Sequence, residues 1–329
     1  MFAKGILFDS RRTFCFQQEA STMTFRSLFT IGLTALMVGG FCQSAPAVII
    51  SALTSTNALV TFDSATPGTI LSNIAVSGLT AGDSLVGIDY RPADGQFVGL
   101  GYNSGTGAAR VYALNGGVAT SINTLALGPG LNRITADFNP TANALRVVTS
   151  AATNFRAPTG GTGALTPDAN INGGNNTGIL ATAYSRNNAG GGTSGATTLY
   201  AIDGTNLVTQ GSIDFFTGSG TSPNTGTLST VAALSGVTGS SIVGFDIFNA
   251  PGTAAGSPGT AFIATNNALF SLNLVTGAAS SLGTVGGGFT IVDIAAVPEP
   301  SSLAFASLAI AGVIAGYRRR RRNSTSSIR

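Results

Sequence analysis

The segment from Val48 to Val297 lacks four residue types that carry much of protein chemistry. It contains no histidine, cysteine, glutamate or lysine, and the two cysteines of the chain, Cys15 and Cys42, lie before it. These absences exclude a histidine general base, a cysteine nucleophile and a zinc site built from histidine and cysteine. They also exclude a disulfide framework, although about 250 residues can bury an adequate core without one.

Charge is scarce and unevenly distributed. The formal net charge of the chain is +3, yet residues 48–297 hold six arginines and ten aspartates, which makes that segment mildly acidic. The positive charge therefore lies in the two ends. Binding of nucleic-acid phosphates needs a basic face on the folded domain, so no nucleic-acid partner is expected. The segment also has no G-x-S-x-G motif and no phosphate-binding glycine loop followed by lysine.

An uncharged segment near the C-terminal end is flanked by a polar motif and a basic cluster. Residues 301–317 are just long enough to cross the hydrocarbon core as a helix. The motif before them is Pro298-Glu299-Pro300, and the cluster after them is Arg318, Arg319, Arg320, Arg321 and Arg322. Arginines hold the adjoining end of a span in the cytoplasm, so residues 323–329 are expected there and the N-terminal bulk outside.

This order of elements over residues 297–322 resembles the PEP-CTERM sorting signal of Gram-negative bacteria. The resemblance implies that a membrane-embedded exosortase recognises the motif and processes the tail, which anchors the protein transiently in the inner membrane. It also implies an association with exopolysaccharide and biofilm. The alternative is an ordinary C-terminal anchor that is not processed.

The N-terminal end has the parts of a secretory signal peptide. Phe25-Arg26 precedes an apolar stretch that ends at Phe41, and Ala45-Pro46-Ala47 supplies an A-x-A cleavage site at Ala45 and Ala47. We therefore expect a signal peptide over residues 23–47. Residues 1–22 do not fit this pattern and are predicted to be an extended or non-native N-terminus.

A pattern of roughly 48 residues recurs between the two ends. Ile88-Asp89-Tyr90 and Ala136-Asp137-Phe138 are 48 apart at the aspartate, and Asp246 and Asp293 are 47 apart, with Ala183-Tyr184 in the corresponding place of a divergent copy. A second motif predicts strands that end at an aspartate or asparagine turn. Its copies are Leu59–Asp63, Val111–Asn115, Leu199–Asp203 and Leu269–Asn273.

These repeats predict an all-β propeller over residues 48–296. The chain divides into five units of four short strands, the first at 48–53, 58–63, 70–76 and 85–91, and six blades are possible if a degenerate unit is present. No periodic helix is expected between the targeting ends. A β-sandwich or a β-solenoid is the rival architecture.

Three short segments resemble the signature of a family of bacterial secreted proteins, domain-of-unknown-function family 4394. They are Phe138-Asn139-Pro140, Leu145-Arg146-Val147-Val148 and Asn154-Phe155-Arg156, and the resemblance extends over about residues 50–295. It implies a propeller-like fold and no known activity. No catalytic residue follows from it.

The recurring aspartates are the first candidate site. Equivalent positions from several blades can converge around the axis of a propeller, so Asp89, Asp137, Asp246 and Asp293 could form a ring that holds a cation. The alternative is structural, with each carboxylate capping its own turn or accepting a neighbouring backbone N–H. The need for the same local solution in every blade favours the structural interpretation.

A second candidate is a calcium loop. Asp168, Asn170 and Asn172 with Gly173 match the opening of a D-x-N-x-N-G loop, but Ile179 stands where that loop needs a bidentate glutamate. A turn rich in asparagine and glycine is the alternative. No cofactor is therefore predicted, with calcium left open.

The third candidate is a ligand-binding set of Arg133, Arg146, Asn154 and Arg156, which holds half of the arginines of residues 48–297 within 24 residues. Bidentate guanidinium groups suit carboxylates, including those of uronic acids in acidic polysaccharides. The alternative is internal pairing with Asp137 or Asp168.

The sequence thus predicts an exported, exosortase-processed protein of the cell surface or extracellular matrix, with a non-catalytic propeller that binds or scaffolds. The alternative is a secreted propeller enzyme, a lyase or hydrolase acting on polysaccharide. Two aspartate carboxylates about 5–10 Å apart in an open pocket would favour hydrolysis, whereas aspartates dispersed in turns would favour a scaffold.

Overall fold

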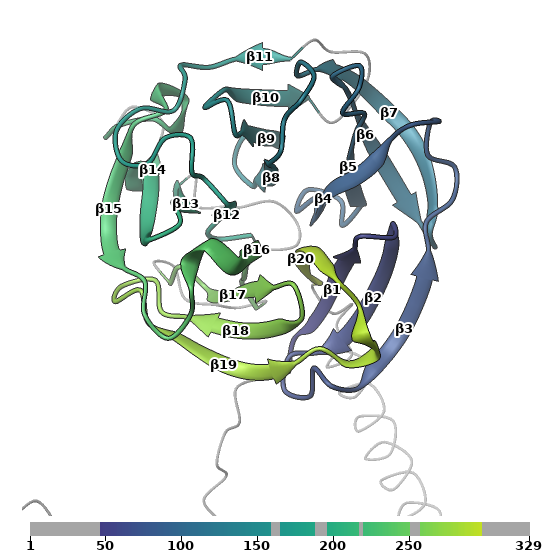
Figure 1. The fold of residues 1–329 in the computed structure, drawn as a ribbon. Coiled ribbons are helices and arrows are strands. Elements are labelled where there is room, and N and C mark those ends of the chain that lie inside the picture. Colours follow the sequence, from purple (N-terminus) through teal and green to yellow (C-terminus); the bar gives the residue numbers. More distant parts are fainter. Residues whose placement is uncertain (1–46, 159–164, 188–195, 217–219, 251–256, 298–329) are drawn as a thin grey trace, which may run out of the picture. The chain divides into compact units, whose positions relative to one another are not determined.

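Five four-stranded antiparallel sheets surround a common axis in the computed structural model (Figure 1). The structure describes residues 47–158, 165–187, 196–216, 220–250 and 257–297. The predicted five-bladed propeller is therefore confirmed. The described residues contain no α-helix and no helix long and apolar enough to cross a membrane.

Each blade runs from an inner strand at the axis to an outer strand at the rim. The first blade is β20 (Ile291–Val297), β1 (Ile49–Thr54), β2 (Ala58–Asp63) and β3 (Ile70–Ala75). The second is β4 (Ser84–Tyr90), β5 (Phe97–Tyr102), β6 (Ala108–Asn115) and β7 (Val118–Ala126). The third is β8 (Ile134–Asn139), β9 (Ala144–Thr149), β10 (Asn154–Pro158) and β11 (Thr166–Pro167).

The last two blades follow the same order. The fourth is β12 (Ala181–Tyr184), β13 (Ala196–Ile202), β14 (Asn206–Phe216) and β15 (Leu228–Ala233). The fifth is β16 (Ile242–Phe248), β17 (Thr260–Thr265), β18 (Ala268–Leu272) and β19 (Ala279–Thr284). In the described part of the chain, three short 3-10 turns connect strands, namely η2 (Pro223–Thr225), η3 (Gly239–Ser241) and η4 (Gly286–Gly288).

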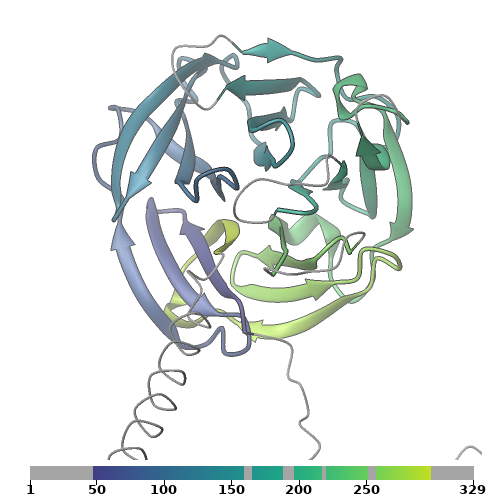
Figure 2. The same cartoon turned by 180° about the vertical axis from the view of Figure 1, so that it is seen from behind.

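The first blade is closed by the end of the domain. Strand β20 pairs antiparallel with β1, with Ala296 opposite Ile50 and Ile294 opposite Ala52. Figure 2 shows the yellow C-terminal strand inside the purple N-terminal strands. One blade thus joins both ends of the domain, which removes the edge that an open ring would leave at β1.

This closure shifts the blade boundaries by one strand from the predicted units. The fourth strand of each predicted unit is not the rim strand of its own blade but the inner strand of the next one. The strand predicted at 85–91, for example, is β4, which begins the second blade. The sequence repeat could not locate this boundary, because a period has no starting point.

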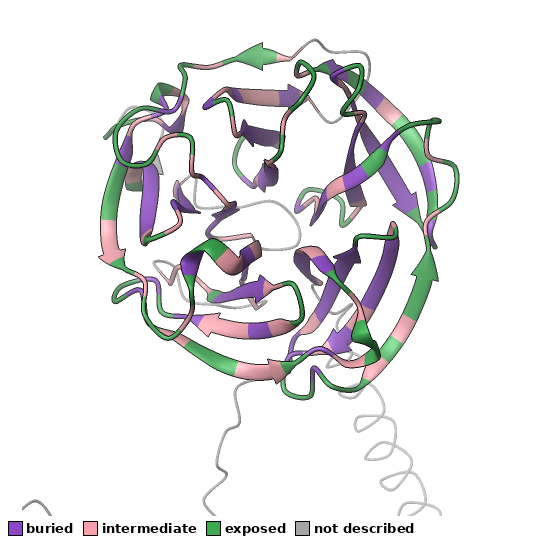
Figure 3. Cartoon of the chain, in the orientation of Figure 1, coloured by how far each residue is buried: buried purple, intermediate pink, exposed green. Residues whose placement is uncertain are grey.

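The hydrophobic core lies between neighbouring blades. One cluster joins the second and third blades through Val98, Val111, Phe138 and Val147, all with at most 1 % of their surface exposed. Burial decreases from the axis to the rim (Figure 3). Strand β9, near the axis, is almost entirely buried, whereas β3, at the rim, is largely exposed. Neighbouring blades therefore cover the strands near the axis and leave the rim strands open to solvent.

The Leu-to-Asp/Asn motif occupies two different places in the blades. Leu59–Asp63, Val111–Asn115 and Leu269–Asn273 cover the third strands β2, β6 and β18, as a true repeat requires. Leu199–Asp203 instead covers β13, the second strand of its blade. All four copies lie on strands as predicted, and the difference in place arises because any buried strand that ends at a turn produces the same local pattern.

Candidate functional site

The four recurring aspartates lie on four of the five inner strands. Asp89 is on β4, Asp137 on β8, Asp246 on β16 and Asp293 on β20, whereas β12 has Ala183-Tyr184 at this level. We call these four residues the aspartate ring. Carboxylate oxygens of Asp89, Asp137 and Asp246 lie within 4.8 Å of one another. The convergence expected from the repeat therefore occurs at the axis.

Each carboxylate of the aspartate ring also joins two inner strands. It accepts a backbone N–H from the inner strand of a neighbouring blade. The donors are Phe138 to Asp89 (2.7 Å), Tyr184 to Asp137 (2.9 Å), Ala296 to Asp246 (2.5 Å) and Ile88 to Asp293 (2.9 Å). Four of the five blade junctions are thus closed by aspartate.

The fifth junction, between β12 and β16, uses amides. Asn249, just after β16, accepts the backbone N–H of Asn187, just after β12, at 3.1 Å. The side chain of Asn187 also bonds to the carboxylate of Asp246. The aspartates therefore converge at the axis, and each carboxylate also satisfies a backbone donor, as the structural alternative expected.

Burial makes the aspartate ring unusual in its protonation. It raises the pKa of Asp89, Asp137 and Asp293 well above 3.8, and it raises the pKa of Asp246 to about 6. Desolvation is the largest cause, and repulsion from neighbouring carboxylates adds to it for the first three. Backbone hydrogen bonds favour the charged form and oppose these increases.

Asp89, Asp137 and Asp246 are the group in the described part of the chain whose carboxylates could share one metal ion. Hard cations such as calcium take carboxylate oxygens as ligands. The same three groups can instead share protons, since like charges at this spacing cannot all ionise without a counter-charge.

A cavity opens at the axis where the inner strands begin. Its volume is about 240 Å³, and its walls come from the first residues of β4, β8, β16 and β20. We call it the axial cavity. Arg133, which immediately precedes β8, is the charged residue of its lining, and Asn132, Asn266 and Thr290 supply further polar side chains.

The guanidinium of Arg133 has few partners. Among the described residues, its one hydrogen bond is to the carbonyl of Leu180 at 3.4 Å, and no carboxylate lies within ion-pairing distance. Desolvation lowers the pKa of Arg133, although the charge of Asp293 opposes that effect. Arg91, Arg110, Arg146 and Arg156 each pair with an aspartate.

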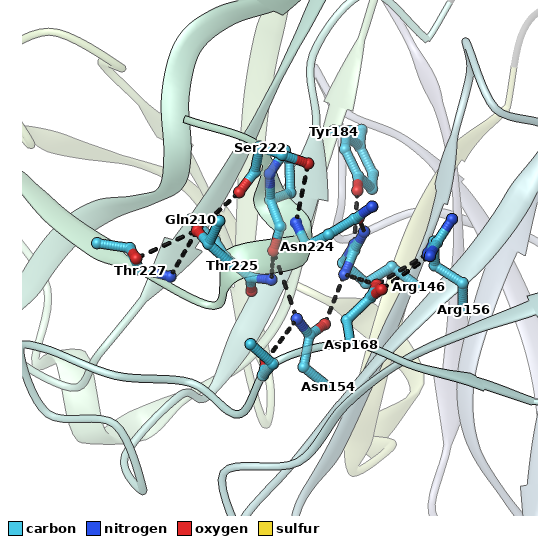
Figure 4. Close-up of polar contacts among 12 residues, drawn as sticks. Arg146, Asn154, Arg156, Asp168, Tyr184, Gln210, Ser222, Asn224, Thr225 and Thr227 are labelled. Atoms are coloured by element: carbon cyan, nitrogen blue, oxygen red, sulfur yellow. Dashed lines mark hydrogen bonds and ion pairs between the residues drawn. The ribbon is translucent and has the colours of Figure 1, made fainter. Parts of the chain in front are cut away.

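Arg146 lies at the centre of a buried polar network and does not line the axial cavity (Figure 4). Its side chain is 1 % exposed. The guanidinium donates to Tyr184 Oη (2.7 Å), Asn154 Oδ1 (2.6 Å), Asp168 Oδ2 (3.0 Å) and Asn224 Oδ1 (2.5 Å). The network joins the third blade to the inner strand of the fourth and to η2, so its role is to dock two blades.

Asp168 is held by two arginines, which is the internal pairing considered as an alternative. Arg156 donates to both of its carboxylate oxygens, at 2.9 Å and 2.8 Å, in addition to the bond from Arg146. These pairs occupy the carboxylate that a calcium loop would need. Asn172 Nδ2 donates to the carbonyls of Asn170 and Thr225, so this segment packs on η2 as an asparagine-rich turn.

The structure therefore divides the predicted ligand-binding set. It brings Arg146, Asn154 and Arg156 together around Asp168, and it places Arg133 apart from them in the axial cavity. Tyr184 and Asn224 were missed as members of the network. They are 38 and 78 residues from Arg146, and no local motif marks either of them.

A larger cavity of about 710 Å³ lies between the fourth and fifth blades. Strands β13 to β15, Pro258 and the turn after β18 line it with hydroxyl and apolar side chains. No charged side chain is among the lining residues. Because no charged group of the described residues points into this cavity, it offers less chemical specificity than the axial cavity.

The predicted signal peptide, the sorting motif Pro298-Glu299-Pro300, the span 301–317 and the arginine cluster lie outside the described residues. Comparison with protein families covers part of them. The family described as domain of unknown function DUF4394 matches residues 58–295, and the PEP-CTERM protein-sorting motif matches residues 296–322. No curated protein matches the chain.

Proposed function

The chain belongs to the DUF4394 family and ends in a PEP-CTERM sorting motif, and from this premise we propose that it is a non-catalytic binding propeller of the cell surface or exopolysaccharide matrix. The sorting motif marks an exported protein that an exosortase processes at the membrane. The location at the cell surface or in the exopolysaccharide matrix is the part that we propose. It is supported by the resemblance of the sorting motif to those of exopolysaccharide-producing bacteria.

The axial cavity is the observation that carries the binding function. Ligand sites are concave, with apolar walls and a few converging polar groups. The axial cavity has both, since Val86, Val243 and Val292 face the same space as Arg133. Four different blades contribute residues to its walls.

The burial of the aspartate ring supports a non-catalytic role. A glycoside hydrolase of the usual kind needs two carboxylates that reach a substrate and a water molecule. Asp89, Asp137 and Asp246 are at most 3 % exposed, and each is committed to a backbone N–H of the next blade. Such groups organise the fold and are poorly placed to touch a polysaccharide.

Fractionation tests the proposed location. The wild-type chain and a variant lacking Pro298-Glu299-Pro300 would be followed through cytoplasm, inner membrane, cell surface and matrix, with mass spectrometry of the C-terminus. We expect the wild type at the surface or in the matrix and the deletion variant retained in the inner membrane. Wild-type protein that stays in the inner membrane with its C-terminus intact would overturn the proposal.

A further inference from the structure

We propose that the axial cavity binds a small carboxylate, which the guanidinium of Arg133 holds through two parallel hydrogen bonds. This inference rests on the proposed binding function and names the chemistry of its ligand. It also separates Arg133 from the other arginines of the predicted set, whose partners lie within the protein.

The first support is the contrast among the arginines. Arg91, Arg110, Arg146 and Arg156 each lie within 3.1 Å of an aspartate oxygen. Arg133 has only the long bond to a carbonyl among the described residues, although it is half-buried in the axial cavity. A partly desolvated guanidinium gains most from a charged acceptor, and a carboxylate matches its planar, paired donors.

The second support is the lining of the axial cavity. Asn132, Asn266 and Thr290 bring amide and hydroxyl groups, which can bond to hydroxyls of a ligand that Arg133 holds. The remaining walls are mostly aliphatic, with Tyr102 among them. A volume of about 240 Å³ is below the range of roughly 300–1,000 Å³ usual for drug-sized ligands, so it suits a hydroxy acid or one sugar residue.

The third support is the charge balance at the axis. Asp293 is the acid whose charge acts on Arg133, yet it lies beyond ion-pairing distance among the described residues. Its carboxylate already accepts the N–H of Ile88, and burial disfavours its ionised form. Within the part of the chain that the structure describes, Arg133 therefore has no anion in contact that would compete with a ligand.

The carboxylate could come from a free organic acid or from a uronic acid residue of a glycan. Isothermal titration calorimetry on the full-length protein in a nonionic detergent separates these sources. The probes are L-lactate, D-galacturonate, trigalacturonate and, as a neutral match, D-galactose. Stronger binding of lactate than of either uronate indicates a free acid, and stronger binding of trigalacturonate indicates a glycan.

Two substitutions test the contact itself. Arg133→Gln removes the charge, and Asn266→Phe narrows the axial cavity at an exposed position without changing charge. Arg91→Gln is the matched control. It changes the net charge equally but lies after β4, at the opposite ends of the inner strands. We expect each test variant to weaken carboxylate binding at least tenfold and the control to leave it within twofold.

Three results would overturn the inference. They are the absence of binding by all three acids, equal binding of galactose and galacturonate, and unchanged binding in both test variants. If Arg133→Gln does not fold, Arg133→Lys and Asn266→Phe still decide, because a lysine cannot form the two parallel bonds. None of these outcomes depends on where fractionation places the protein, so location and ligand chemistry fail separately.

Discussion

The carboxylate of Asp137 accepts the backbone N–H of Tyr184 at 2.9 Å, and this bond joins the inner strands of the third and fourth blades. The same carboxylate lies close to those of Asp89 and Asp246. The aspartate ring thus contributes a favourable term and an unfavourable one. It satisfies backbone donors at the axis, and it brings together acids that repel one another when ionised.

Stability should therefore decrease as the pH rises. Burial raises the folded-state pKa of the ring carboxyls above the unfolded value of 3.8, to about 6 for Asp246. The folded protein then binds more protons than the unfolded chain, and stability is lost upward from about pH 4 through the folded pKa. We expect Tm to fall between pH 5 and pH 8, measured by differential scanning calorimetry.

The slope is about 1.4 kcal/mol per pH unit for each proton that the folded state retains and the unfolded state has lost. Measurement in EDTA keeps divalent cations from occupying the carboxylates. The arginines stay charged over this range, so Arg133 does not reverse the sign. A Tm that rises steadily from pH 5 to pH 8 would contradict the protonation assigned to the aspartate ring.

Replacing one ring aspartate by asparagine removes a repelling charge, and the effect on stability should differ between Asp137 and Asp89. Both carboxylate oxygens of Asp89 accept backbone N–H groups, from Tyr90 (2.6 Å) and Phe138 (2.7 Å). Asp137 accepts one, from Tyr184, among the described residues. Asn has one acceptor oxygen, so Asp137→Asn keeps this bond and turns its NH₂ toward the other carboxylates.

We accordingly expect Asp137→Asn to raise the unfolding free energy at pH 8 by about 1 kcal/mol and to flatten its pH dependence. Asp89→Asn should lower it by about 1–3 kcal/mol, because one buried N–H then faces an NH₂ group. Urea unfolding at pH 5 and pH 8 provides both values. Equal changes in unfolding free energy for the two substitutions would show that the number of backbone N–H groups bound by each carboxylate does not determine the effect.

The convergence of the four aspartates could be predicted from the sequence, whereas the backbone N–H groups that each carboxylate accepts could not. Asp89 and Asp137 are 48 residues apart and Asp246 and Asp293 are 47 apart, so each pair occupies equivalent inner strands, which the propeller arranges around one axis. Their hydrogen-bond donors lie one blade away, and the donor position relative to the aspartate differs between junctions. Such offsets depend on how blades pack, which a repeat period does not encode.

The arginine set shows the same limit. Proximity in sequence offered Asp137 or Asp168 as the internal partner, and Asp168 pairs with Arg146 and Arg156, which are neighbours on paired strands. Arg133 belongs to the same stretch of chain, yet it precedes an inner strand and faces the axis. Only the assignment of strands to blades separates the two environments, and the predicted units placed that boundary one strand away.

Loss of Arg146 should destabilise the fold more than loss of Arg156. Arg146→Met removes a buried guanidinium and leaves Asn154, Tyr184 and Asn224 without their donor, which costs about 3–5 kcal/mol. Arg156 is 35 % exposed and Asp168 keeps Arg146, so Arg156→Met should cost about 1 kcal/mol.

Urea unfolding of both variants at one pH checks this difference. Because the network joins the third and fourth blades, hydrogen exchange in Arg146→Met should increase first at β9 and β12. Similar losses in the two variants would contradict a docking role for Arg146. They would place the stabilisation in the exposed pair with Asp168.

The hairpin between β6 and β7 offers a test of backbone conformation at two adjacent glycines. Asn115 pairs with Val118, so Gly116 (φ 58°) and Gly117 (φ 85°) form a two-residue turn with both residues left-handed. A Cβ at Gly117 would overlap Ile74 of the neighbouring blade, whereas a Cβ at Gly116 meets nothing within 4 Å. Asn tolerates the left-handed region better than Ala does.

We therefore expect Gly116→Asn to change the unfolding free energy by less than about 0.5 kcal/mol and Gly117→Ala to lower it by about 1–3 kcal/mol. Thermal unfolding of the two variants would give these values, and a larger loss for Gly116→Asn would contradict the assigned turn.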